Sequence, residues 1–119
     1  DNPIHDLGAL EIDYRAEWKD SRLYEATNIV AASGWGSFLM DVAMEWVSSH
    51  KGWLYPDRKS ITPEAKVMWS VYHDQTKRPD VTTMKMNDNL IKGLRIEHEE
   101  DELKCLYQKL KQPLIEEMI

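Results

Sequence analysis

The feature that most constrains the fold of this chain is a change of hydrophobic period inside one stretch, IVAASGWGSFLMDVAMEW, residues 29–46. Residues 23–32 (LYEATNIVAA) are rich in β-branched and aromatic side chains and run up to the glycines, which favours a strand. From Ser37 the apolar residues recur at a helical spacing of about 3.6. The stretch therefore predicts a strand that turns through Gly34 and Gly36 into an amphipathic helix.

That helix has a predicted core face and a predicted solvent face. The core face comprises Leu39, Val42, Ala43, Trp46 and Val47. The solvent face comprises Asp41, Glu45 and Ser48. Gly52 follows closely enough to end the helix as a left-handed cap.

The other segments alternate between strand and helix signals. We expect strands at residues 10–14, 53–55 and 81–86, a hairpin connection at 15–22 and a helix at 63–74. We expect a further helix that opens with the acidic run 99–102, carries an apolar stripe over 103–110 and is stopped by Pro113. Thr62 and Pro63 form a strong start for the first of these helices, because threonine caps and proline suits the first helical position. The predicted order is β-β-α-β-α-β-α, which is typical of a layered α/β or α+β domain.

The length and the net charge of the chain limit the classes of protein to which it can belong. A chain of 119 residues with 42% hydrophobic residues fits a single domain over residues 1–119. We expect a hairpin in 1–32, a glycine turn, helix and strand in 33–55, and a helix, a strand and a C-terminal helix in 56–119. The net charge of −6, with scattered basic residues, argues against nucleic-acid binding. No apolar run is long enough to span a bilayer, so we expect a soluble protein without a membrane partner.

The glycine turn is a candidate anion site. Ser33, Gly34, Trp35, Gly36 and Ser37 would present backbone N–H groups at the positive end of the helix dipole, where a phosphate can approach. The alternative is a tight corner that uses glycine only for its backbone freedom. A third glycine for a dinucleotide fingerprint and the Gly-Lys-Ser/Thr of a Walker loop are both absent.

Four blocks in order, SGWGSFLMDVAMEW, GWLYPDR, ITPEAKVMWSVYHD and RPDV, resemble the GNAT acetyltransferase superfamily and, more closely, a bacteriophage-associated GNAT-like group. The resemblance covers roughly Gly34 to Val81. It implies a mixed, mostly antiparallel sheet flanked by helices. It also implies that the glycine turn binds the pyrophosphate of acetyl-CoA. Ala31 stands where the family motif begins with arginine or glutamine. The upstream elements of the family are missing or shortened, so we expect truncation on the N-terminal side.

The resemblance also implies an activity. We expect an N-acetyltransferase-like phage protein that transfers an acyl group from acyl-CoA to an amine by direct attack. The acceptor stays open. Tyr72 matches the tyrosine that some members use to protonate the departing thiolate, and its alternative is a core tyrosine on an apolar stripe.

Amine attack also needs a proton acceptor, for which Glu45 and Asp57 are the candidates. The alternatives are a solvated helix face for Glu45, and a turn or an Arg58 pair for Asp57. His5, His50, His73 and His98 show no zinc-binding spacing, and we expect no metal. Cys105 is the single cysteine, so no intrachain disulfide forms.

A second class of function stays open beside the enzyme. The chain would then be a catalytically inactive GNAT-fold protein of the phage virion, or a host-interaction (anti-defence) protein. Its partner would be a phage or host protein. Exposed tryptophans at Trp18 and Trp35 would favour this class, and an open splay between residues 23–32 and 53–55 would favour the enzyme. Either function places the chain in the host cytoplasm or the virion.

Overall fold

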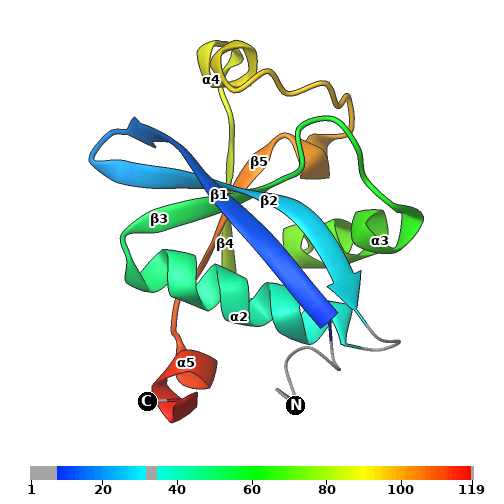
Figure 1. The fold of residues 1–119 in the computed structure, drawn as a ribbon. Coiled ribbons are helices and arrows are strands. Elements are labelled where there is room, and N and C mark those ends of the chain that lie inside the picture. Colours follow the sequence, from blue (N-terminus) through cyan, green and yellow to red (C-terminus); the bar gives the residue numbers. More distant parts are fainter. Residues whose placement is uncertain (1–7, 32–34, 119) are drawn as a thin grey trace.

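The computed structural model describes residues 8–31 and 35–118, in which a five-stranded mixed sheet carries helices on its two faces (Figure 1). The strands are β1 (Gly8–Trp18), β2 (Ser21–Ala31), β3 (Gly52–Pro56), β4 (Val81–Lys85) and β5 (Cys105–Lys109). The helices are α2 (Gly36–Ser49), α3 (Pro63–His73), α4 (Asp88–Gly93) and α5 (Pro113–Met118), with a 3₁₀ turn η1 at Asp101–Leu103. The predicted layered α/β class is confirmed.

The strand order across the sheet is β1-β2-β3-β5-β4. β1 and β2 form an antiparallel hairpin, and α2 then carries the chain to β3, which runs parallel to β2. β5 lies between β3 and β4 and is antiparallel to both. The last strand in the sequence therefore sits in the interior of the sheet.

The hairpin connection is shorter than the sequence indicates. We expected residues 15–22 to join the strands, but β1 continues to Trp18 and β2 begins at Ser21. Only Lys19 and Asp20 form the turn, with φ of 49° and 64°. Two consecutive left-handed residues match the right-handed twist of a hairpin, so the charged segment continues the two strands.

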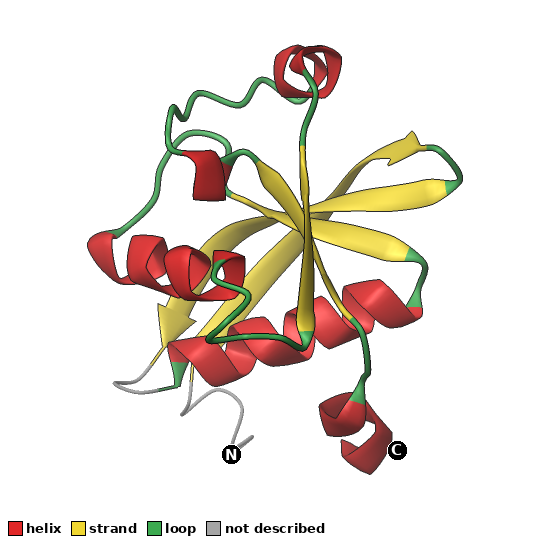
Figure 2. Ribbon diagram, turned by 180° about the vertical axis from the view of Figure 1, so that it is seen from behind, coloured by secondary structure: helices red, strands yellow, loops and turns green. Residues whose placement is uncertain are grey.

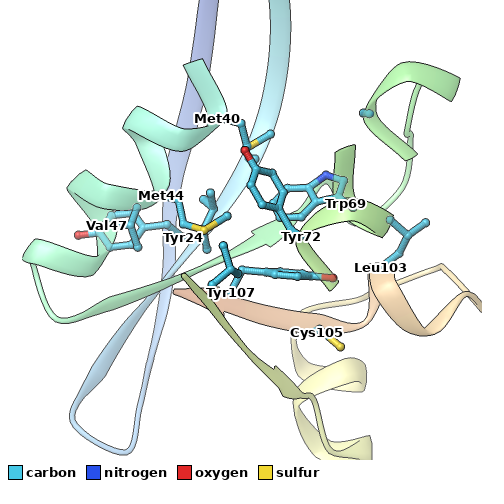
Figure 3. Packing of buried hydrophobic residues seen from close by; sticks show 13 residues of the cluster. Tyr24, Met40, Met44, Val47, Trp69, Tyr72, Leu103, Cys105 and Tyr107 are labelled. Carbon is cyan, nitrogen blue, oxygen red and sulfur yellow. The ribbon is translucent and has the colours of Figure 1, made fainter. Parts of the chain in front are cut away.

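Hydrophobic clusters cover both faces of the sheet. On one face, side chains of α2 and α3 pack against the strands, as Met40, Met44, Trp69, Tyr72 and Tyr107 do in Figure 3. On the other face, the segment around α4 supplies Leu94 and Ile96 against strand residues. Figure 2 shows α2 and α3 from behind. The two helices that we expected at the core both reach it.

The buried face of α2 is rotated from the predicted one. Met40, Met44 and Val47 are fully buried, and so is Glu45, which we expected on the solvent face. Trp46, expected in the core, is 40% exposed. Counter-charges from distant segments explain the difference, because they allow the polar side of the helix to pack inward.

Two further local predictions are wrong. Residues 103–110 were expected to be a helix, but Cys105–Lys109 is strand β5, where an interior strand buries both faces and so lacks strict alternation. Gly52 does not cap α2: the left-handed residue is Lys51, with φ of 58°. Gly52 instead allows close packing, because a Cβ there would lie 2.8 Å from Val47 Cγ1.

Candidate functional site

The parallel ladder between β2 and β3 ends part-way along β2. Their last Cα pair is Ala26 with Pro56, whereas β2 continues to Ala31. Thr27 follows at once and is an extra residue in β2, because Glu11 pairs with Asn28 and Ile12 pairs with Ala26. Such bulges re-aim the backbone and are frequent beside active sites. β2 thus extends beyond the end of β3. Trp53–Tyr55 pair with Leu23–Glu25 throughout, so the open splay that would favour the enzyme is not found between these residues.

A cleft of ≈ 400 Å³ lies between the first turn of α2 and the side of α3, and we call it the α2–α3 cleft. Its lining residues are Gly36, Ser37, Glu64, Val67, Met68, Val71, Tyr72 and Arg78. Figure 1 shows the start of α2, the end of β2 and α3 on the same side of the molecule. The volume falls within the range of about 300 to 1,000 Å³ typical of small-molecule sites.

The start of α2 offers backbone donors to this cleft. The first intrahelical hydrogen bond runs from Leu39 N to Trp35 O, so the N–H groups that precede it lack an intrahelical partner. The first turn carries no acidic residue, and Trp35 makes no side-chain cap. This helix end therefore keeps its positive field toward the cleft. Glu64 on the opposite wall is the charge that opposes an anion there.

Tyr72 joins the two helices that form the cleft. Its hydroxyl donates to Asp41 Oδ1 at 2.8 Å and lies 3.3 Å from Ser37 O. Arg78 Nη2 donates to the same Asp41 oxygen at 3.0 Å, and the guanidinium sits 4.9 Å from the centre of the Tyr72 ring. Burial, with Asp41 adding to it, raises the pKa of Tyr72. Tyr72 is therefore a protonated hydroxyl in the wall of the cleft at neutral pH.

Arg78 is fixed by two carboxylates. Besides Asp41, it binds Asp80 through Nε at 3.0 Å and Nη2 at 2.8 Å. The hydrogen bonds to Asp80 are the main cause that raises the pKa of Arg78. The segment before β4 is thereby attached to α2, and one cation lines the cleft.

Glu45 does not line the cleft. Its Oε2 binds Lys109 Nζ at 2.5 Å, and its Oε1 accepts from Leu114 N at 2.7 Å and Ile115 N at 3.2 Å. A buried carboxylate that holds a lysine of β5 and the start of α5 has its oxygens occupied. Glu45 thereby connects α2 to β5 and to the start of α5.

A second cavity, of ≈ 180 Å³, begins where the parallel ladder ends, and we call it the strand-end cavity. Its lining residues are Ala26, Thr27, Asp57, Ser60, Ile61, Thr62, Ala65 and Trp69. Asp57 Oδ1 accepts from Lys59 N at 2.8 Å and Ser60 N at 2.9 Å, which confirms the predicted turn. Asp57, one of the two carboxylates considered as bases, lines this cavity.

The structure brings only part of the predicted site together. Gly36, Ser37 and Tyr72 line the α2–α3 cleft, and Trp35 lies at its helix end. Ser33 and Gly34 lie outside the described residues. Sequence reasoning missed Asp41 and Arg78, since no local signal indicates that residues 37 positions apart share a hydrogen bond.

No family model, curated protein or solved structure matches this chain. Among residues 8–31 and 35–118, no group of three or more His, Cys, Asp or Glu side chains is placed to hold a metal ion. Within the same residues, every helix is too short or too polar to cross a membrane. The candidate site is therefore argued from its own geometry.

Proposed function

We propose that this protein binds an acyl-CoA in the α2–α3 cleft and transfers the acyl group to an amine. The pyrophosphate of the cofactor would bind the N–H groups at the start of α2, in the turn that resembles the GNAT motif. The thioester would lie beside Thr27, where β2 extends past the end of β3 and its backbone N–H groups on that side would polarise the carbonyl. Acetyl-CoA is the simplest such donor, and the acceptor amine stays open.

One observation carries this proposal: the bulge, the end of the β2–β3 ladder and the cleft at α2 occur on consecutive parts of one chain segment. β2 loses β3 after Ala26, bulges at Thr27 and leads into α2, whose first turn lines the cleft. A strand that extends beyond its neighbour, next to a helix N-terminus without a side-chain cap, suits a thioester and a diphosphate on one ligand.

Within this proposal Tyr72 is the candidate acid. Its hydroxyl lies in the cleft wall, and its proton would leave the hydrogen bond to Asp41 when it goes to the thiolate. Burial and Asp41 oppose the tyrosinate that this step forms, and Arg78 beside the ring favours it. Asp57, in the strand-end cavity, replaces Glu45 as the candidate base. If Tyr72 is the acid and Asp57 the base, substitution of either residue should lower the rate of acyl transfer and leave the affinity for acetyl-CoA unchanged.

The first experiment is isothermal titration of the chain with acetyl-CoA, using two matched glycine variants. Gly36→Asp adds a carboxylate in the cleft. Gly93→Asp makes the same change where a new Cβ would meet nothing within 4 Å. We expect one equivalent to bind wild type and Gly93→Asp alike, and binding to Gly36→Asp to be at least about tenfold weaker because like charges repel. Absence of heat at millimolar acetyl-CoA, with the chain shown folded by circular dichroism, would contradict the proposal.

The chemistry is tested with Tyr72→Phe and a panel of primary amines. Release of free CoA from acetyl-CoA should slow by about 100-fold, the usual size of a general-acid contribution. The dissociation constant for acetyl-CoA should stay within about twofold of wild type. An unchanged rate would leave Tyr72 a core tyrosine.

The second candidate function, an inactive virion or host-interaction protein, is favoured by a different observation. Trp35 and Phe38 are 40% and 38% exposed and pack edge to face with ring centres 5.7 Å apart. Exposed aromatic pairs are typical of interfaces. Trp18, in contrast, is half-buried at the end of β1. A chain that binds no CoA, but whose capture of virion or host proteins is lost in Trp35→Ser, would support this function.

A further inference from the structure

The strand-end cavity lies where the acyl group of the proposed cofactor would point. It starts at Ala26 and Thr27, the residues at which β2 loses β3. On α3 it is lined by Ala65 and Trp69, whereas the α2–α3 cleft is lined by Met68 and Tyr72. These positions are on adjoining sides of the same helix. The cavity is therefore the space next to the cleft that an acyl group bound beside Thr27 would enter.

The cavity is larger than an acetyl group needs. Its volume is ≈ 180 Å³, and a protein cavity of about 150 Å³ is enough to hold benzene. The small side chains of Ala26 and Ala65 leave this space open, and both are buried. Trp69 closes one wall and is held against Tyr107 with ring centres 4.8 Å apart. An acetyl methyl group would leave most of this volume unfilled.

The charge at the rim limits what the cavity accepts. Asp57 lines it and is held in place by the two backbone N–H groups of Lys59 and Ser60. A second carboxylate in so small a space would meet a like charge and lose hydration. The apolar side chains Ala26, Ile61, Ala65 and Trp69 make up half of the lining, and Thr27, Asp57, Ser60 and Thr62 make up the other half. Walls of this mixed kind with a carboxylate among them suit an uncharged chain and disfavour a dicarboxylic one.

We propose that the acyl donor carries an uncharged acyl chain of about four to six carbons, the length that a cavity of this size holds, and that this chain occupies the strand-end cavity. This inference rests on the proposed function, because it specifies the donor of the same reaction. Ala26, Ala65 and Trp69 set the chain length, and Asp57 excludes acyl groups with a free carboxylate.

The test is a titration series with CoA, acetyl-CoA, butanoyl-CoA, hexanoyl-CoA and succinyl-CoA. Butanoyl-CoA should bind about tenfold more tightly than acetyl-CoA, since it buries two more methylene groups. Succinyl-CoA should bind no more tightly than acetyl-CoA. CoA has no acyl group, so its affinity measures binding to the α2–α3 cleft alone. The affinity for CoA therefore tests the proposed function, and the differences between the acyl-CoA esters test this inference.

Two variants fill the cavity from different sides. Ala65→Leu adds volume at the buried wall, and Ser60→Phe adds it at the exposed rim, where the fold tolerates a larger side chain. Both should reduce the preference for butanoyl-CoA to less than about twofold while leaving the affinity for CoA unchanged. Ser70→Phe, at an exposed position of α3 outside both lining sets, is the matched control and should behave as wild type.

Three results would overturn the inference. Equal affinity for acetyl-CoA and butanoyl-CoA, with CoA bound, would reject the longer chain and leave the proposed function standing. A butanoyl preference that survives both Ser60→Phe and a folded Ala65→Leu would place the chain outside this cavity. Failure to bind any of the five ligands would reject this inference together with the proposed function.

Discussion

At the scale of single residues, the polar side of α2 determines how this helix packs. Asp41 and Glu45 lie one turn apart, and each meets a cation from a distant segment: Arg78 at 3.0 Å and Lys109 at 2.5 Å. Glu45 is fully buried, so its desolvation is offset by the lysine and by two backbone donors of α5. Removing one partner of a buried pair therefore lowers the free energy of unfolding by more than the intact pair contributes to it.

Glu45→Ala should destabilise the protein by about 3 to 5 kcal/mol, because it leaves the Lys109 ammonium buried without its partner. Urea unfolding of wild type and variant measures this. Glu99→Ala, at an exposed position, should change stability by less than about 0.5 kcal/mol. The double variant Glu45→Met, Lys109→Met should recover most of the loss. A single variant as stable as wild type would mean that water reaches Lys109.

Gly52→Ala should destabilise the protein by about 1 to 3 kcal/mol, because the added methyl group would be crowded by the surrounding atoms. The added Cβ would lie 2.8 Å from Val47 Cγ1 and 3.0 Å from the backbone oxygen of Arg22. Gly93→Ala is the matched control: nothing lies within 4 Å, and alanine should raise stability by about 0.5 to 1 kcal/mol in a helix. Thermal or urea unfolding compares the two, and equal changes would contradict the packing role of Gly52.

At the scale of elements, α3 lines both the α2–α3 cleft and the strand-end cavity. Its start is well defined, since Thr62 Oγ1 accepts from Ala65 N at 3.1 Å and Pro63 occupies the first turn. Thr62 also lines the strand-end cavity. The position of this helix start therefore affects both sites.

Thr62→Ala should cost about 1 kcal/mol of stability, the usual value of a helix cap. Thr62→Ser keeps the accepting hydroxyl and should restore most of it. Urea unfolding gives the stabilities, and amide hydrogen exchange of residues 64–66 should report faster opening in the alanine variant alone. Equal exchange in both variants would show that packing, and not the cap, holds this turn.

At the scale of the whole molecule, a chain of ion pairs connects elements that are distant in sequence. Asp80 binds Arg78 and lies 3.8 Å from Lys109, which in turn binds Glu45. The hydrogen bond from Arg78 is the main cause that lowers the pKa of Asp80. The pKa values of Asp74 and Glu100 are lowered as well, by hydrogen bonds from the Thr76 side chain and from the backbone, respectively.

The stability of the protein should fall as the pH drops. A carboxyl group with a lowered folded pKa binds fewer protons in the folded state, so its contribution is complete above the unfolded value of about 4 and is lost as pH falls through the folded value. The urea midpoint should therefore be lower at pH 3 than at pH 6. Asp80→Asn should make this dependence shallower, whereas Asp20→Asn, in the exposed hairpin turn, should not. A steeper dependence in Asp80→Asn would contradict the assigned pairing.

Only the part of the candidate site that is local in the chain could be predicted from the sequence. The strand, the glycine turn and the start of α2 follow one another, so Gly36 and Ser37 could be assigned to a helix N-terminus. Tyr72 could be placed on α3 but not against Asp41, because that contact depends on how two helices cross. The proposed chemistry stays a prediction of the resemblance and the geometry together.

What the sequence determined by itself is the set of elements with a local signal. The hairpin, α2, β3, α3 and β4 are found where period, capping and breaker residues indicate them. The tertiary structure alone decided that residues 105–109 enter the sheet between β3 and β4, and that α2 turns Glu45 inward. The physical reason is the same for both. A strand forms its hydrogen bonds with residues far along the chain, and a buried charge is paired with a residue far along the chain. No local sequence pattern indicates these distant partners.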